Sequence, residues 1–149
     1  MHPRTQLAAR ALLVAVAAAG LAVDAWAHIS LAADYDPVRS SALSQGDLFR
    51  AEGALAILAA VLLLLWPRRR WTAALACVTA AGGLAAVLVY QYVDVGAIGP
   101  FPNMYEPVWY ARKTESAWGE GAAAVAAFAL LLLVAPLRLH PRMKEIETS

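Results

Sequence analysis

Apolar residues fall in four long blocks along the chain, and short polar stretches separate the blocks. They cover about 7–27, 48–66, 71–93 and 117–137. Each is about 19 to 23 residues long, and about 20 apolar residues in a helix span the hydrocarbon core of a bilayer. A proline and a triple arginine follow the second block and end that helix. The pattern predicts an all-α protein with four membrane-spanning helices.

A repeated pattern divides these blocks into two pairs. The segment at 35–38 reads YDPV and returns at 105–108 as YEPV, and the segment at 51–53 reads AEG and returns at 119–121 as GEG. The copies are offset by 70 residues at the first match and by 68 at the second. Self-similarity at a nearly constant period indicates that the chain is built from two copies of one unit.

The repeat also predicts how the helices are arranged. We expect a single membrane domain over 1–149, in which repeat one covers about 7–67, repeat two covers about 71–137, and 138–149 form a cytoplasmic tail. Each copy holds two spans, so both copies enter the membrane in the same direction. The predicted fold is a four-helix transmembrane bundle of two parallel two-helix repeats, related by a pseudo-twofold axis along the membrane normal.

Small residues and a helix cap add detail to this bundle. Runs of alanine and glycine at 17–20, 80–83 and 122–127 predict the faces where helices pack, because helices in lipid associate by close packing rather than by apolar burial. Ser44 and Asp47 have the spacing of a capping box. We therefore expect the second helix to begin there, ahead of its apolar block.

Basic residues set the expected orientation. Eight lysines and arginines lie on the side of the two termini and the 67–70 turn, and four lie on the other side. Because cytoplasmic loops carry the excess of basic residues, this distribution predicts a multi-pass protein of the plasma membrane with both termini in the cytoplasm. The acidic loops at 28–47 and 94–116 then face outward.

An alternative interpretation concerns the first block. Arg4 and Arg10, the apolar stretch that follows them and the sequence Ala-Trp-Ala at 25–27 also fit a secretory signal with a cleavage site. Loss of residues 1–27 would break the pairing of the two copies, and we therefore expect the first block to be retained.

Composition excludes an ordinary soluble domain. The chain is 61% hydrophobic and 15% charged, whereas soluble domains carry about 25% charged residues. The net charge of +1 indicates no particular partner, and the single cysteine, Cys77, excludes an intramolecular disulfide. The sequence has no phosphate-binding loop, no HExxH motif and no nucleic-acid motif. We expect no cofactor and no nucleic-acid partner.

Glu52 and Glu120 are the strongest candidates for chemistry within the spans. They lie 15 and 16 residues before the prolines that end the second and fourth blocks, and thus at matching depths. An ionisable group inside a span is costly, about 2.5–3.5 kcal/mol for Asp at mid-membrane, so it normally faces the bundle interior. One hypothesis is a paired acidic site that holds a cation or a proton. The alternative is that each glutamate reaches the outer surface or pairs with Arg50 or Arg112.

Asp24 and His28 form a second candidate group. They are four residues apart at the outer end of the first span, so they share one helical face. Together with Glu52 they could form a carboxylate–histidine cation site, in which His28 is the candidate metal ligand. The equivalent positions in the third span are about Tyr90 and Asp94, so the histidine is not repeated and such a site would be asymmetric. The alternative is that His28 is an ordinary hydrogen-bonded residue.

The repeated tyrosine motifs are candidates for the outer face. They would contact a partner protein or a lipid headgroup through Tyr35, Asp36, Tyr105, Glu106 and Trp109. The alternative is a turn anchored at the membrane interface by its tyrosine, as interfacial aromatic residues commonly are.

The composition rich in Ala, Leu and Arg, the four spans and the acidic outer loops resemble the small integral membrane proteins of high-GC actinobacteria. In size and number of spans the chain is also similar to the DoxX-like family. The resemblance covers the whole chain, but it rests on no motif and transfers no functional residue.

Three functions are compatible with these patterns. The first is an accessory protein that contacts the lipid bilayer and presents its outer loops to a lipid or to another membrane protein, since polar residues are nearly absent from the inner two thirds of the spans. The second is a proton- or cation-coupled transporter that uses Glu52 and Glu120, either as a single chain or as a homodimer. The third is a membrane enzyme that acts on a lipid or a metal through Asp24, His28 and Glu52.

Overall fold

The computed structural model describes residues 3–133, which form four helices and no strand. The helices are α1 (Pro3–Leu31), α2 (Gln45–Leu65), α3 (Arg70–Tyr92) and α4 (Ala111–Leu133). Each is long and apolar enough to cross a membrane, which confirms the predicted all-α class and the four candidate spans. The tail expected at 138–149 and the end of the fourth block lie outside the described residues.

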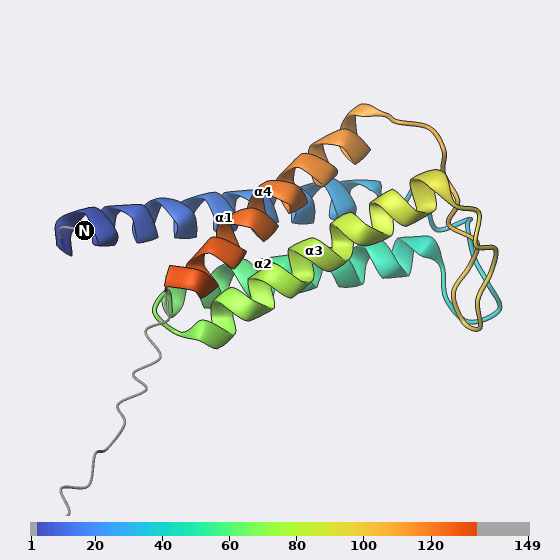
Figure 1. Cartoon of the computed structure of the whole chain (residues 1–149). Coiled ribbons are helices and arrows are strands. Elements are labelled where there is room, and N and C mark those ends of the chain that lie inside the picture. Colours follow the sequence, from blue (N-terminus) through green and yellow to red (C-terminus); the bar gives the residue numbers. More distant parts are fainter. Residues whose placement is uncertain (1–2, 134–149) are drawn as a thin grey trace, which may run out of the picture.

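Successive helices run in opposite directions, so the chain passes up and down along the bundle (Figure 1). The first residues of α1, the turn at 66–69 and the last described residues of α4 lie at one end, which we call the turn end. The segments at 32–44 and 93–110 lie at the other end, which we call the loop end. α1 packs on α2 and α4, and α3 packs on α4 and more loosely on α2.

The interior of the bundle is built mainly from alanine. Three leucines are the largest apolar side chains that are fully buried: Leu21, Leu63 and Leu130. The other core residues are mostly small: Ala17, Ala18, Ala25, Ala56, Ala59, Ala60, Ala73, Ala76, Ala80, Ala123, Ala126 and Ala127. Large apolar side chains such as Val78 and Val125 point outward and are more than 70% exposed. This distribution fits helices that pack closely inside and contact lipid outside.

α1 and α4 make their closest approach through glycine on both helices. A Cβ atom added at Gly20 would collide with the backbone oxygen of Gly119, and one added at Gly119 would lie 2.8 Å from the backbone oxygen of Gly20. Backbone therefore contacts backbone at this crossing. The small-residue run at 17–20 was predicted to be a packing face, and α4 is the helix that packs on it.

The second helix begins at the predicted capping box. The backbone N–H of Asp47 donates to Ser44 Oγ at 3.0 Å, and the backbone N–H of Ser44 donates to Asp47 Oδ2 at 3.0 Å. Arg50 then ties this first turn to the preceding loop, because its guanidinium donates to both carboxylate oxygens of Asp36 at 2.7 and 2.8 Å. The cap and the ion pair fix the position of α2 at the loop end.

The glycine crossing gives a direct test of the packing. We expect Gly20→Ala to lower the free energy of unfolding by about 1–3 kcal/mol, because the added methyl group must push the backbone of α4 away. Gly121→Ala is the matched control, since its added Cβ would meet its nearest neighbour at 3.9 Å. Thermal unfolding in detergent, followed by circular dichroism, compares the two. Equal stability of both variants would contradict the close crossing.

Candidate functional site

Side chains with acid–base chemistry from three helices converge inside the loop-end half of the bundle. Asp24 and His28 come from α1, Glu52 from α2 and Glu120 from α4; we call these four residues the acidic cluster. Asp24, Glu52 and Glu120 lie seven to nine residues inside their helices, or ~10–14 Å from the loop end at 1.5 Å per residue. The cluster is therefore well inside the candidate spans.

Gly83 of α3 provides the space in which two of these carboxyl groups meet. A Cβ atom added at Gly83 would collide with Glu120 Oε1 and would lie 3.2 Å from Glu52 Oε1. Both glutamates, which sequence analysis paired by depth alone, thus reach the same point on α3. Glycine is needed there because any side chain would occupy the volume that the carboxyl groups use.

Asp24 lies at the centre of the hydrogen bonds within the cluster. It is fully buried, and its Oδ1 accepts a hydrogen bond from Ser116 Oγ at 3.0 Å. The same oxygen lies 2.7 Å from His28 Nδ1, which is also 3.2 Å from the backbone oxygen of Asp24. The four-residue spacing thus places both side chains on one face of α1. Asp24 Oδ2 has no hydrogen-bond partner among the residues that the structure describes.

Glu120 is the most unusual residue of the cluster. Its side chain is fully buried, and neither carboxyl oxygen has a hydrogen-bond partner within residues 3–133. One ligand atom each from Asp24, His28 and Glu120 lie within 4.8 Å of one another. Glu52 Oε1 is buried and unpartnered in the same part of the chain.

Buried carboxylates without partners are costly, and the cost increases when like charges lie close together. The basic side chains at this end of the bundle do not offset that cost. Arg50 pairs with Asp36 and Asp47, and Arg112 lies over the Trp26 ring at 3.7 Å from its centroid. The described ion pairs therefore exclude the predicted alternative in which Arg50 or Arg112 neutralises Glu52 or Glu120.

Lys113 is a buried cation of the same region, but its partners are backbone groups. Its Nζ donates to the backbone oxygen of Glu106 and lies 3.5 Å from that of Val108. It also lies 5.5 Å from the centroid of the Trp109 ring. Apart from His28, whose ring can pair with Asp24 when it is protonated, the described basic side chains do not neutralise the cluster, so its remaining charge must be met by bound protons or by a bound cation.

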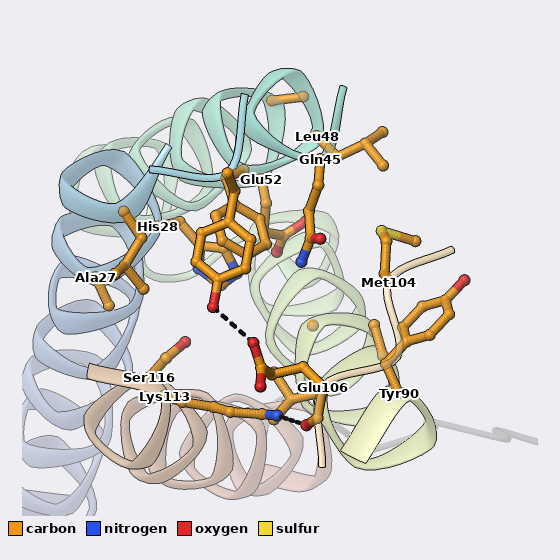
Figure 2. A pocket seen from close by; sticks show the side chains of 18 of the residues that line it. Ala27, His28, Gln45, Leu48, Glu52, Tyr90, Met104, Glu106, Lys113 and Ser116 are labelled. Atoms are coloured by element: carbon orange, nitrogen blue, oxygen red, sulfur yellow. Dashed lines mark hydrogen bonds between the residues drawn. The ribbon is translucent and has the colours of Figure 1, made fainter. Parts of the chain in front are cut away.

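A cavity of about 500 Å³ lies toward the loop end, and His28 and Glu52 are the members of the cluster that line it. Gly83 and Ser116 also line this cavity. Its walls are largely apolar and include Leu31, Leu48, Phe49, Leu55, Val87, Phe101 and Met104. Figure 2 shows side chains from all four helices and from the 93–110 segment around the open space. A concave, mainly apolar cavity with a few polar groups at one point is typical of a small-ligand site.

The two repeated tyrosine motifs meet at the mouth of this cavity. The Tyr35 hydroxyl donates to Glu106 Oε2 at 3.0 Å and lies 2.8 Å from the Tyr110 hydroxyl. Dashed lines in Figure 2 mark the bonds that Glu106 makes with the tyrosine and with Lys113. Tyr35 and Glu106, which were expected to contact a partner on the outer face, bind each other.

Burial controls the ionisation of these phenols. It raises the pKa of Tyr35 well above its ordinary value of about 10, and the bonds to Tyr110 and Glu106 act in the same direction. Burial also raises the pKa of Tyr110. Outside the cavity, the Arg50 guanidinium lowers the pKa of Asp36. The phenols at the mouth therefore remain neutral hydrogen-bonding groups.

The remaining predicted residues lie away from the cluster. Asp94 is exposed and accepts hydrogen bonds from Asn103 Nδ2 at 3.0 Å and from the backbone N–H of Gly96 at 3.1 Å. Tyr105 and Trp109 are 41% and 42% exposed, so their side chains remain available at the loop end. Asp94 thus belongs to a loop and not to the candidate cation site.

Sequence analysis missed several residues that the structure brings to the site. Ser116 and Lys113 lie in the first turns of α4, where no motif distinguishes them. Gln45 lines the cavity from the first turn of α2. Gly83 belongs to a predicted small-residue face, but its role is to leave room for carboxyl groups rather than for a helix. The absence of a side chain gives no signal of which neighbour will use the space.

Comparisons of the chain with protein-family models, with curated proteins and with solved structures find no match. The function is therefore inferred from the chemistry of the acidic cluster and its cavity.

The phenols at the mouth give a pH-dependent prediction. Because their folded-state pKa lies above the unfolded value of about 10, their contribution to stability is complete below that pH and is lost as the pH rises through the folded pKa. We expect an ultraviolet titration to show late-ionising phenols among the five tyrosines.

Tyr35→Phe should remove one of these late-ionising groups, and Tyr105→Phe, whose hydroxyl lies outside this bond network, should leave them unchanged. An unchanged number of late-ionising phenols in Tyr35→Phe would contradict the arrangement at the mouth.

Proposed function

We propose that this chain is a membrane-embedded binding protein whose acidic cluster takes up a cation or a proton from the cavity at the loop end. One observation carries the proposal: Glu120 is fully buried with both carboxyl oxygens unpartnered, beside Asp24 and His28, in the described part of the chain. A carboxyl group in these surroundings requires a positive charge or a proton. The proposal combines the binding protein expected from sequence with the paired acidic site of the transporter hypothesis.

The turn-end half of the bundle supports binding from one side only. Below the cluster, the buried side chains of the described residues are alanine, leucine and valine, apart from Thr79 and Thr72. Thr72 donates to the backbone oxygens of Trp66 and Arg69 and is thereby used in the turn. A path for a charged solute needs polar groups along its length. Transport across the membrane would therefore require a second arrangement of the helices.

The proposal also includes the two parallel repeats and their pseudo-twofold axis. Support comes from Glu52 and Glu120, which occupy equivalent positions and both reach Gly83. The symmetry is limited, because α1 crosses α4 closely while α2 and α3 border the cavity. We further propose the plasma membrane as the location, with the turn end in the cytoplasm, since the triple arginine 68–70 lies at that end.

A hydrophobic carbodiimide tests the proposed function, because it reacts with protonated carboxyl groups in apolar surroundings. After treatment with a chelator, we expect dicyclohexylcarbodiimide to label the cluster of the liposome-embedded protein at Glu120 or Glu52. Mass spectrometry of peptides identifies the site. Glu120→Gln should remove the label at that position, whereas Glu106→Gln, which changes a carboxyl group at the mouth, should leave it in place.

Absence of carbodiimide labelling at the cluster would contradict the proposed function. If no residue of the cluster is labelled at any pH between 5 and 8, its carboxyl groups exchange no occupant with the cavity, and the proposed function is wrong.

A further inference from the structure

We infer that Asp24, His28 and Glu120 form a binding site for one divalent transition-metal ion of the Zn²⁺ or Mn²⁺ type. This inference rests on the proposed cation binding and specifies which cation the cluster takes. It depends on the positions of the ligand atoms, on the chemistry of the donors and on the oxygen atoms that remain unpartnered.

The ligand atoms have the spacing that a single ion requires. One from each of Asp24, His28 and Glu120 lie within 4.8 Å of one another. Bonds of about 2.0–2.2 Å to a common metal place donor atoms roughly 3–4 Å apart. A small inward movement of flexible side chains is enough to reach that spacing.

Buried carboxyl oxygens without hydrogen-bond partners distinguish this site from an ordinary acidic patch. Asp24 Oδ1 is engaged by Ser116 and His28, and its Oδ2 has no partner among the described residues. Both oxygens of the fully buried Glu120 are also unpartnered in that range. Asp24 and Glu120 thus keep unpartnered carboxyl oxygens, and one ligand atom of each lies within 4.8 Å of the other and of a His28 nitrogen, where a metal ion could bind.

The donor set favours one class of metal. An imidazole with two carboxylates suits Zn²⁺, Mn²⁺ and related ions, whereas Mg²⁺ and Ca²⁺ prefer oxygen donors alone. Thiolate-selective ions are disfavoured, because Cys77 donates to the backbone oxygen of Ala124 and is not part of the cluster. Two carboxylates also match the charge of a divalent ion.

Neighbouring groups would hold the ligands and supply a route to the site. Ser116 donates to Asp24, and Phe49 packs edge-on against the His28 ring with centroids 5.0 Å apart. Such outer contacts typically orient metal ligands and change affinity by about 10- to 100-fold. Glu52 lies on the cavity side, where it can accept an incoming ion or complete its coordination.

Metal titration of the purified, tag-free full chain in nanodiscs tests the site directly. After removal of metals with a chelator, we expect Zn²⁺ and Mn²⁺ to bind at one ion per chain, and Mg²⁺ to bind at least about 100-fold more weakly. Isothermal titration calorimetry and elemental analysis give the affinity and the stoichiometry. Glu120→Gln and His28→Ala should each weaken Zn²⁺ binding at least 100-fold, while Asp94→Asn, which changes an exposed carboxyl group in the loop, should leave it unchanged.

A second pair of variants changes the site without removing a donor. Gly83→Ala places a methyl group where the Glu120 carboxyl lies, and we expect it to weaken Zn²⁺ binding at least 10-fold because the carboxyl end must move. Gly121→Ala adds a methyl group on the helix that carries Glu120, where the nearest atom lies 3.9 Å away, and should leave the affinity unchanged. Thermal unfolding of both variants shows that each is folded.

The outcomes distinguish this inference from the proposed function. If the carbodiimide labels the cluster but Zn²⁺ neither binds nor protects it, the metal site is wrong and proton or organic-cation binding stands. If neither reagent reaches the cluster, both proposals are wrong. Zn²⁺ binding that survives Glu120→Gln and His28→Ala, or preferential binding of Mg²⁺, would also overturn the assignment.

Discussion

The contact between the backbones of α1 and α4 is the constraint on which the rest of the bundle depends. Gly20 and Gly119 meet without side chains between them, and this sets how closely the two helices approach. Asp24 lies one turn beyond Gly20, and Glu120 directly follows Gly119. A crossing this close therefore brings two carboxyl groups together deep inside the bundle, where Ser116 can also reach Asp24. A larger residue at either glycine would separate the helices and disperse the acidic cluster.

α2 and α3 lack a close glycine crossing of the kind that joins α1 and α4. α2 and α3 pack on each other more loosely than the other neighbouring helices do, and both line the cavity. Gly83 removes one more side chain from that region and lets Glu52 and Glu120 extend toward each other. Toward the turn end, alanines such as Ala59 of α2 and Ala76 of α3 belong to one buried cluster that includes residues of all four helices. Close packing on one side and at one end thus leaves a cavity toward the loop end, and Glu52 of the acidic cluster lines it.

The number and length of the apolar helices could be predicted because they depend on local composition, and the capping box of α2 because it depends on a three-residue spacing. The repeat predicted the common depth of Glu52 and Glu120. It could not predict that Asp24 would bind Ser116, which lies 92 residues away, or that Asp94 would remain in a loop. Depth follows from position along a helix, whereas contact depends on rotation about its axis. In spans that are apolar on every side, the hydrophobic pattern gives little information on rotation.

Protons and metal ions would compete for the same oxygens, so one site can account for either kind of occupant. What distinguishes binding from transport is the packing below the cluster. Beyond Thr79, the described interior toward the turn end is apolar apart from Thr72, whose hydroxyl is used in the turn, and its helices pack through alanines. An ion released in that direction would have to lose its carboxylate ligands before it could reach water, at the cost of an unpaired charge in hydrocarbon. Exchange through the loop-end cavity avoids that cost, because Glu52 lies along the route. Binding from one side is therefore the function that this packing supports.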